Sequence, residues 1–595
     1  MNRWSILSGV GLAAAATTFA ACGDSRSGYA DGKGAFDTTP EAGTEPPAAP
    51  QCTGQRVCSR DLRSVVDACD ETKVLAACPD DQACGDGACL PACDAAVSAG
   101  ASIGCEFAAL PPSGSGHGYE GSCFAAFLAN TWSTPTRIEG EYKGQALDIA
   151  AAARLVRTNG GQVTYEPFHG ELPPGEVAVV FLSQGEQTNR NTFIPCPDGV
   201  TPAVARDTSI LGTARGASFR LRTSAPVSAY SIYPFGGEKS AVSSATLLLP
   251  VASWKPGYIV TNPWDVTIAL GSATRPTTQI VAAEDDTEVT IVGSTGIQSG
   301  RDVEGALKGK PRTWKLARGE AIQLAQHEEL TGSRISANKN IAVWGGHECM
   351  FVPSGQFACD ASQDQLVPLQ SWGSEYAVVP HLSRLANGVP EQYHYRIVGA
   401  VGGTTLTYEP SQPNGAPAEL AAGEVKVFTS QTPFVVRSQD AEHPFAVYSY
   451  MNGYGWQQAT NSEGDPELVS VIPSAQFLDR YVFFADPTYP NSQIVVVRSR
   501  DEGKEFEPVT LGCAGELDGW APLGTSGKYE YTRVWLTRQR KPQQVGTGTC
   551  GAGRHELQSR GAVGVTVWGT GFAASYGYPG GAAIRKLNSV ETIIK

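Results

Sequence analysis

The chain has 595 residues and a formal net charge of −14, from 45 Lys and Arg against 59 Asp and Glu. Nucleic-acid binding needs a concentrated basic surface, so this acidic balance, without basic runs, argues against DNA or RNA as partners. The length exceeds one hydrophobic core and predicts several domains. The 67 Gly and 39 Pro residues, with charged residues at only 17%, favour short strands joined by turns, and so predict an all-β fold.

The first residues have the order of an export signal. A positively charged start precedes an apolar run at 6–16, and Phe19-Ala-Ala-Cys22 follows as a cleavage site. This order is typical of a bacterial lipoprotein signal peptide at residues 1–21, with Cys22 as the lipidated residue. An ordinary secretory signal with a chance cysteine is the alternative. Residues 22–51 are rich in Gly, Pro and Ala and predict a flexible tether.

Lipidation at Cys22 would fix the location of the mature chain, because two or more acyl chains hold a protein at a bilayer. Gly23 follows the lipidation site, where an inner-membrane protein often has Asp, and this favours the outer membrane. We therefore expect a lipid-anchored protein of the bacterial cell envelope. The sequence leaves open whether it faces the periplasm or the outside.

Fifteen cysteines in an exported chain predict disulfide bonds. Residues 52–95 hold seven of them, and a module this small needs cross-links because it cannot bury enough apolar surface. Cys-x-x-Cys pairs are not found in this module, so zinc is not expected there. The later cysteines suggest three pairs: Cys123 with Cys196, Cys349 with Cys359, and Cys513 with Cys550.

An apolar phrase that ends in an aromatic residue occurs four times: Val227-Ser-Ala-Tyr230, Ile341-Ala-Val-Trp344, Phe445-Ala-Val-Tyr448 and Val565-Thr-Val-Trp568. Such repetition indicates that one supersecondary unit was copied, at a spacing of roughly 100–120 residues that suits a β-sandwich. Over 96–595 we predict repeated antiparallel β-sandwich-like units. Their expected ranges are 104–255, 256–372, 373–476 and 477–595. A β-propeller built from the same strands is the alternative.

A second phrase supports the repeat. Val163-Thr-Tyr-Glu-Pro167 and Leu406-Thr-Tyr-Glu-Pro410 share four letters, and Val289-Thr-Ile291 is a weaker version. Each is followed by Leu-x-x-Gly-Glu, whereas the fourth unit has no clear copy. We expect the three phrases to occupy equivalent strands.

The sequence contains no catalytic motif that we can identify, and it predicts no cofactor. His347-Glu-Cys-Met-Phe351 has Phe where a zincin needs its second His, so we interpret His347 as a loop residue. Glu284-Asp-Asp286 offers carboxylates for calcium, but a solvated hairpin tip is the favoured interpretation. A catalytic carboxylate pair that meets only in the folded protein is not visible in the sequence.

One stretch is unusually dense in aromatic residues. From 448 to 456 it contains Tyr450, Tyr454 and Trp456, interrupted by Gly. Such a stretch suits an exposed contact loop that stacks on a sugar or anchors an interface. A corner packed over the sandwich is the favoured interpretation, and the contact loop is kept as the candidate site.

Four stretches together resemble the IgGFc-binding protein N-terminal domain family. They are Gly104-Cys-Glu-Phe107, Ile335 to Trp344, Asp364-Gln-Leu-Val-Pro368 and Ser575 to Gly581. The preceding cysteine-rich module resembles those found before this domain in exported myxobacterial proteins. The resemblance implies non-catalytic binding at an extracellular surface; it does not imply antibody binding, and it assigns no contact residue.

We therefore expect a binding or adhesion protein of the cell surface, whose partner is an extracellular protein or glycan that the sequence does not identify. Two alternatives stay open. One is a carbohydrate-active enzyme on the same β scaffold, and the other is a structural envelope component without a discrete ligand.

Overall fold

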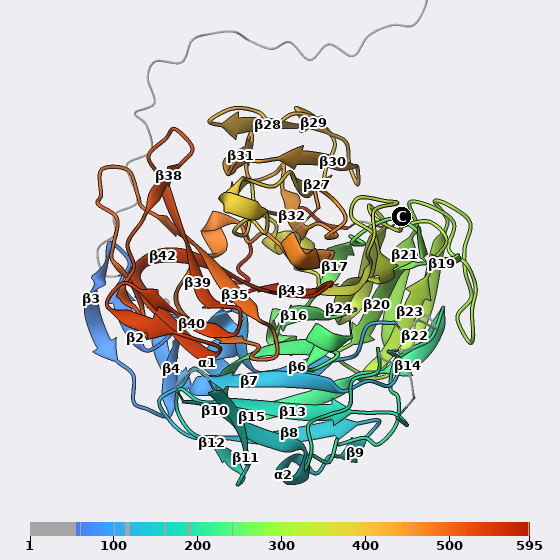
Figure 1. Ribbon diagram of the computed structural model, residues 1–595, viewed down its shortest axis with the longest axis horizontal. Coiled ribbons are helices and arrows are strands. Elements are labelled where there is room, and N and C mark those ends of the chain that lie inside the picture. Colours follow the sequence, from blue (N-terminus) through green and yellow to red (C-terminus); the bar gives the residue numbers. More distant parts are fainter. Residues whose placement is uncertain are drawn as a thin grey trace, which may run out of the picture. The chain divides into compact units, whose positions relative to one another are not determined.

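The computed structural model describes residues 55–59, 61–99, 101–113, 119–159, 162–187, 192–240, 242–269, 271–458, 460–592 and 594. The expected signal peptide, the lipidation site Cys22 and the tether lie outside these residues. Gly54–Lys595 forms one folded body (Figure 1), and the repeated groups of strands within it are called units below. Within the described residues, no helix has both the length and the apolar character needed to cross a bilayer.

The cysteine-rich module begins the described chain. Its strands are β1 (Arg56–Cys58), β2 (Ser64–Asp67), β3 (Asp70–Ala77), β4 (Gln82–Gly85) and β5 (Ala88–Pro91), followed by helix α1 (Ala92–Ala99). Disulfides join Cys58 to Cys84, Cys78 to Cys89 and Cys93 to Cys105. The module shares a small apolar core with the next unit, because Leu62 and Ala95 pack with Trp132. The Trp132 indole also donates a hydrogen bond to the Asp80 carbonyl at 2.9 Å.

Two groups of strands follow. The first unit contains β6 (Ile103–Ala109), β7 (Phe124–Asn130), β8 (Thr136–Tyr142), β9 (Gln145–Ala146), α2 (Ile149–Ala152), β10 (Ala153–Asn159), β11 (Gln162–Pro167), β12 (Glu171–Leu172), β13 (Val177–Ser183), β15 (Phe219–Tyr233) and β16 (Ser244–Leu248). The second contains β17 (Lys255–Ile259), β18 (Thr267–Ala269), β19 (Ser272–Thr274), β20 (Pro276–Ala282), β21 (Thr287–Val292), β22 (Pro311–Leu316), β23 (Glu320–Ala325), β24 (Arg334–Met350) and β25 (Asp360–Gln365). Strand β14 (Ala214–Ala217) precedes β15 in the chain but pairs with β23, so it links the two units.

The other two groups complete the chain. The third unit contains β26 (Glu375–Val378), β27 (Tyr393–Gly399), β28 (Thr404–Glu409), β29 (Glu419–Leu420), β30 (Val425–Ser430), β31 (Phe434–Ser438), β32 (Phe445–Met451) and β33 (Glu467–Ser470). The fourth contains β34 (Leu478–Ala485), β35 (Asn491–Ser499), β36 (Val509–Leu511), β37 (Gly515–Glu516), β38 (Ala521–Leu523), β39 (Tyr529–Arg538), β40 (Lys541–Val545), β41 (Gly548–Cys550), β42 (Gly553–Gly571) and β43 (Ala574–Pro579). Short 3-10 turns lead from each unit to the next: η2 (Val251–Ser253), η3 (Leu369–Ser371) and η6 (Ser474–Gln476).

The four units share one antiparallel pattern, which confirms the predicted all-β repeat fold. A long strand near the end of each unit, namely β15, β24 or β42, pairs with the unit's first strand and, further along, with its last strand. In the third unit this long strand is divided into β31 and β32, so its two sheets are separate. Strands β15, β24 and β42 each belong to one large sheet, of 10, 8 and 10 strands, instead of a four-stranded blade. The described sheets therefore do not form a closed propeller, and that alternative is wrong.

The repeated aromatic residues occupy equivalent positions on these long strands. Each lies opposite a residue of the unit's last strand, in the pairs Tyr230–Leu247, Trp344–Gln365, Tyr448–Ser470 and Trp568–Gly577. All four aromatic side chains are buried. The phrase therefore marks the core of each unit, as its apolar character predicts.

The second repeated phrase does not lie on equivalent strands in all three units. Leu172, Leu316 and Leu420 do lie at equivalent points, because each pairs with the Thr that opens a strand of its unit. In the first unit that strand is β8, whereas Val163 to Pro167 lies on the added hairpin strand β11. Only the copies on β21 and β28 are equivalent, so the prediction for the first unit is wrong.

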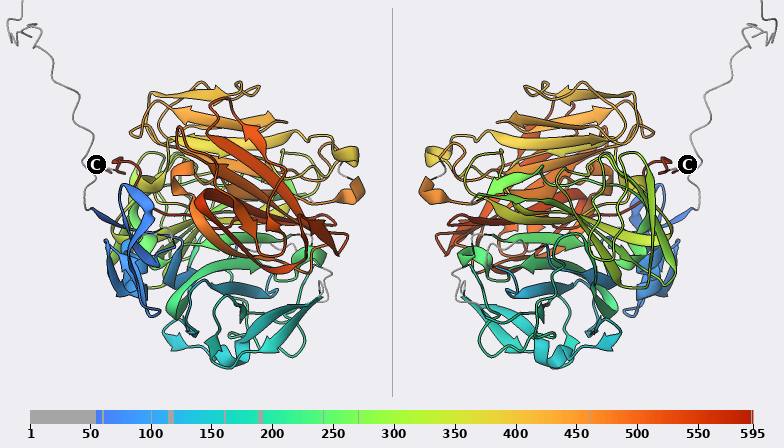
Figure 2. Two further views of the ribbon diagram at one scale, coloured as in Figure 1. Left: turned by 90° about the vertical axis from the view of Figure 1, so that its left-hand side faces the viewer. Right: turned by 90° about the vertical axis from the view of Figure 1, so that its right-hand side faces the viewer.

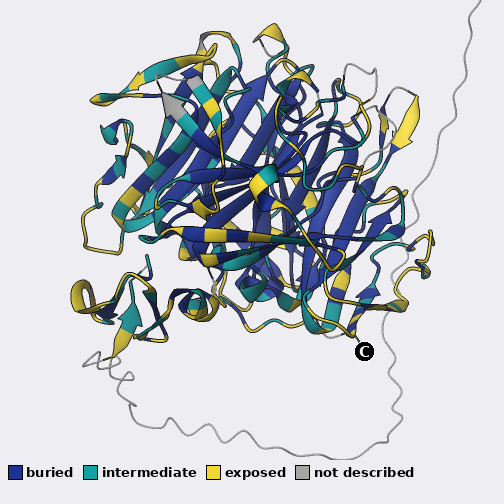
Figure 3. Cartoon of the chain, turned by 90° about the horizontal axis from the view of Figure 1, so that it is seen from below, coloured by how far each residue is buried: buried dark blue, intermediate teal, exposed yellow. Residues whose placement is uncertain are grey.

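The last strands of the four units meet in the interior. Strand β16 contacts β25 and β43, and β33 contacts the same two strands. Figure 2 shows strands of the first unit (cyan) and of the third (yellow) on opposite sides of this junction. Figure 3 shows that buried residues fill the interior strands, while exposed residues gather in loops and hairpins. We call the meeting place of β16, β25, β33 and β43 the central junction.

Buried carboxyl groups connect the strands of the central junction. Asp364 accepts hydrogen bonds from the hydroxyls of Thr246, at 3.2 Å, and Ser470. Glu467 accepts from the Ser244 hydroxyl at 3.3 Å. Burial raises the pKa of Asp364 to about 6 and raises that of Glu467 well above its ordinary value. These groups hold protons more tightly than exposed carboxyls, because burial disfavours their charged form.

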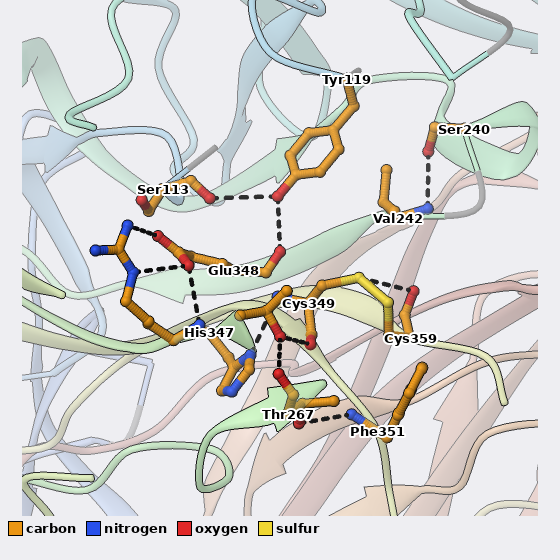
Figure 4. The surroundings of a disulfide bond; sticks show 12 residues. Ser113, Tyr119, Ser240, Val242, Thr267, His347, Glu348, Cys349, Phe351 and Cys359 are labelled. Carbon is orange, nitrogen blue, oxygen red and sulfur yellow. Dashed lines mark hydrogen bonds and ion pairs between the residues drawn. A yellow bond between two sulfur atoms is a disulfide. The ribbon is translucent and has the colours of Figure 1, made fainter. Parts of the chain in front are cut away.

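His347 is a strand residue, which corrects its interpretation as part of a loop. It lies on β24, is fully buried, and adjoins the disulfide between Cys349 and Cys359 (Figure 4). Its Nδ1 accepts a hydrogen bond from the Cys349 amide at 3.1 Å, so Nε2 carries the proton and donates to the Asp265 carbonyl at 3.0 Å. Burial lowers the pKa of His347 to about 3. The imidazole is thus a neutral structural group.

Candidate binding site

A groove with a volume of about 840 Å³ lies between the third and fourth units. Residues between 382 and 390, together with 431–433, line it from the third unit. Strand β39 and residues 490–491 and 571–572 line it from the fourth. Its size lies within the range of small-molecule and oligosaccharide sites.

One face of β39 supplies the groove's largest side chains. Side chains alternate between the two faces of a strand, so Thr532, Val534 and Leu536 are buried. The intervening residues Tyr531, Arg533 and Trp535 are half-exposed and point outward. We call these three residues and the exposed Arg538, which follows on the same hairpin, the β39 ridge.

Each cation of the β39 ridge lies close to an aromatic ring. The guanidinium carbon of Arg533 is 5.5 Å from the ring centre of Tyr531, and that of Arg538 is 5.0 Å from the ring centre of Trp535. A cation over an aromatic face is attracted by the ring's negative face, which restrains a long side chain. The ridge therefore presents arginines that are partly ordered before any ligand arrives.

A second hollow of about 510 Å³ shares the ridge with the groove. It too is lined by Tyr531, Arg533 and Trp535, and continues past 517–519, Ala521 and 543–546. The same three side chains therefore contact two hollows. A ligand that covers the whole ridge therefore extends into both hollows.

A buried ion pair supports the opposite wall of the groove. The side chains of Arg384 and Glu391 are 0% and 1% exposed and meet at 2.6 Å. Arg384 also donates to the carbonyls of Asn452, at 2.8 Å, and Glu463, at 3.0 Å. Burial alone would raise the pKa of Glu391, but the charge and hydrogen bonds of Arg384 lower it to about 2. The pair fixes the 382–391 connection to the end of β32 and to the loop after it.

A buried histidine lies beneath the ridge. The His381 ring packs against Tyr393 and Trp568, with centroid distances of 4.9 and 5.2 Å. Its Nδ1 donates to the Leu382 carbonyl at 2.8 Å, and burial lowers its pKa to about 4, so the ring is neutral at pH 7. The His381 carbonyl accepts from Arg533 Nη1 at 3.5 Å. This contact ties the middle of the ridge to the third unit.

The charges of the groove divide into paired and unpaired groups. Glu238 is 3.4 Å from Arg540, and Glu463 accepts from the Thr570 hydroxyl at 2.6 Å. Among the described residues, Arg533 and Arg538 have no carboxylate partner within ion-pair distance. The unpaired charge at the ridge is therefore positive, although the whole chain is acidic.

The predicted contact loop lies beside the groove, and one of its three candidate residues is wrong. Tyr450 is fully buried on β32 and donates to the Pro263 carbonyl, so it cannot contact a ligand. Tyr454 and Trp456 are half-exposed. The Trp456 indole donates to the Gln392 carbonyl at 3.3 Å, and the loop then reaches the groove at Asn461.

The ridge itself was missed from the sequence. Its signal is the alternation Tyr531-x-Arg533-x-Trp535, with buried residues between. The period of two predicts one face with large half-polar side chains. The wall pair Arg384–Glu391 has no such signal.

Two other sequence features have structural outcomes. The acidic hairpin is neutralised by neighbouring cations, since Lys315 lies 2.6 Å from Asp286 and Lys339 lies 3.8 Å from Glu284. The structure contains the three later disulfides that the sequence suggested: Cys123–Cys196, Cys349–Cys359 and Cys513–Cys550.

The fold defines a class, that of all-β proteins built from repeated antiparallel units, here with an open groove between two of them. The family model described as IgGFc binding protein matches residues 244–569, which is more than half of the chain, and the chain belongs to this family. The match includes the residues that line the groove except Glu238, Gly571 and Phe572.

One curated relative is the human (Homo sapiens) IgGFc-binding protein. It is 24% identical over 338 residues, which cover 55% of this chain but 6% of the human protein. The chain therefore corresponds to a small fraction of that relative's length. No solved structure matches the chain.

Proposed function

We propose that this chain is a lipid-anchored, non-catalytic binding or adhesion protein of the bacterial cell envelope, and that its groove takes the ligand. The observation that carries the proposal is the β39 ridge, where Tyr531, Arg533 and Trp535 stay half-exposed on a strand that β35 pairs along its length. Tyr, Trp and Arg dominate binding energies wherever they fill a contact surface. Family membership supports binding as the activity.

The anchor part of the proposal rests on Cys22 and residues 22–51. A flexible tether of this length has a mean reach of about 30 Å, which places the folded chain clear of the bilayer. Metabolic labelling with a radioactive fatty acid tests it. We expect label on the wild-type chain and none on Cys22→Ser, which should leave the membrane fraction. Membrane retention without label would contradict the anchor.

The binding part is tested by capture from envelope and matrix material with the full chain in detergent, and IgG is included in the panel. We expect a saturable partner whose capture falls about tenfold in Trp535→Ala. Trp520→Ala is the matched control, because Arg498 lies 4.1 Å from its ring centre but Trp520 lines neither hollow. A partner captured equally by both variants would place the site elsewhere, with the loop at Tyr454 and Trp456 as the next candidate. Failure to capture any partner would favour a structural envelope role.

One observation favours a second candidate, a carbohydrate-active enzyme. Glu238 and Glu463 both line the groove, and glycoside hydrolysis uses two carboxyl groups. Both are already engaged, by Arg540 and by Thr570 respectively. Turnover of a polysaccharide by the wild-type chain that disappears in Glu463→Gln, with binding retained, would establish the enzyme instead.

A further inference from the structure

The chemistry of the ridge narrows the ligand, given the proposed function. We infer that the groove binds an acidic polysaccharide, a chain of sugar rings whose carboxylates pair with Arg533 and Arg538. The inference rests on three features of the groove: its unpaired arginines, its neutral polar lining, and the continuity of the two hollows.

The arginines of the ridge are available to an anion. Arg533 and Arg538 have no carboxylate partner among the described residues. Of the two glutamates that line the groove, Glu238 pairs with Arg540, and Glu463 accepts a hydrogen bond from the neutral Thr570 hydroxyl. A guanidinium presents a planar fork of donors that matches a carboxylate bidentately. Because the whole chain carries a net charge of −14, a polyanion is repelled at long range and needs such local contacts.

The rest of the lining suits sugar rings. Gln431, Asn461, Asn491 and Gln539 bring neutral amides to the groove. An amide both donates and accepts hydrogen bonds, which matches a hydroxyl that does the same. Tyr531 and Trp535 add aromatic surface against which the apolar face of a sugar ring packs.

The strand pairing does not by itself exclude a peptide. A peptide that binds a sheet by strand addition needs a free backbone edge. On one side β39 pairs with β35 through Ser492–Ser499, but on the other side its pairing covers only Tyr529–Tyr531 with β38 and Thr537–Arg538 with β40. The preference for a sugar chain therefore comes from the amides and rings of the lining, and poly-glutamate is the probe that tests a peptide.

The two hollows call for an extended ligand. They have volumes of about 840 and 510 Å³ and share Tyr531, Arg533 and Trp535. Residues on one face of a strand are about 7 Å apart, so successive sugar units meet successive ridge side chains. A polymer that crosses the ridge fills both hollows, whereas a monosaccharide fills neither.

The test measures binding of four probes to the full chain in detergent: polygalacturonate, dextran, poly-glutamate and the monosaccharide galacturonate. We expect polygalacturonate to bind, galacturonate to bind at least tenfold more weakly, and dextran and poly-glutamate not to bind. The double variant Arg533→Gln, Arg538→Gln should lose at least tenfold in affinity for polygalacturonate, and its binding should depend less on salt.

The matched control is Arg206→Gln. Arg206 also lies over an aromatic ring, 5.8 Å from the centre of Tyr142, but it lines neither hollow. Its affinity for polygalacturonate should be unchanged. Thermal unfolding of each variant checks that a loss of affinity does not arise from misfolding. If the double variant does not fold, the single variant Arg538→Gln is used in its place.

The outcomes separate the two proposals. Equal binding of dextran, or arginine-dependent binding of poly-glutamate, would overturn the acidic polysaccharide while keeping the groove as a binding site. Polygalacturonate binding that is insensitive to both arginines would overturn the assignment of the anion contacts. No binding of any probe, together with Trp535-dependent capture of another partner, would overturn this inference but leave the proposed function in place.

Discussion

The wall and the ridge of the groove keep arginines in opposite states. Arg384 in the wall is 0% exposed and meets Glu391 at 2.6 Å, whereas Arg538 on the ridge is exposed and lies over Trp535. A buried charge must be neutralised within the fold, because desolvation without a partner costs several kcal/mol. A half-exposed charge keeps its hydration and stays available to a ligand. The paired arginine of the wall therefore stabilises the fold, whereas the unpaired arginine of the ridge is available for contact.

The largest expected effect comes from breaking the wall. Glu391→Gln leaves the Arg384 charge buried without a counter-charge, and we expect a loss of about 3–5 kcal/mol in the free energy of unfolding. Urea unfolding measures it. Glu507→Gln is the control, because its partner Arg560 is 78% exposed and such pairs contribute about 0–1 kcal/mol. Equal losses in the two variants would show that the buried Arg384–Glu391 pair contributes no more to stability than an exposed pair.

Buried carboxyl groups in and beside the central junction make the stability of the fold depend on pH. Burial raises the pKa of Asp364 and Asp486 to about 6 and raises that of Asp465 further. The folded protein therefore holds protons that the unfolded chain releases above about pH 4. The stability they confer is complete below that pH and is lost as pH rises through 6 and beyond.

Asp465→Asn should flatten this dependence, because an amide does not titrate. We expect the slope of unfolding free energy against pH to fall by up to about 1.4 kcal/mol per pH unit between pH 5 and 8. Chemical denaturation at several pH values measures the slope. Asp501→Asn, at a side chain 83% exposed, should leave it unchanged. Stability that rises with pH over this interval would contradict the assignment.

The smallest effect on stability is expected at the edge of the groove. Phe572 is 66% exposed, so Phe572→Ser should change the unfolding free energy by about 0.5 kcal/mol or less. Polygalacturonate affinity should nevertheless fall, because the residue lines the groove. Leu307→Ser, at a site 78% exposed and outside the groove, is the control for a lost apolar surface residue. A lower affinity in both variants would show that the effect is not local.

The sequence could predict the repeat but not the groove. Trp344 and Trp568 belong to copied apolar phrases, and an apolar period of two determines which side of a strand faces the core. The groove arises where two units meet, so its residues come from 382–390 and 529–538, which no local pattern connects. The pair Arg384–Glu391 becomes visible only when a buried charge is found with its partner. Tyr450 shows the converse, since ring density alone did not separate a buried strand residue from an exposed loop residue.

The way in which the cysteine-rich module joins the first unit has a mechanical consequence. Trp132 packs into the module, and the Cys93–Cys105 bond connects α1 to β6. A pull applied at the N-terminal end of the described chain is therefore carried through covalent cross-links into a sheet strand, which the pull shears along its length. Under tension such a joint should resist extension longer than one made of non-covalent contacts alone.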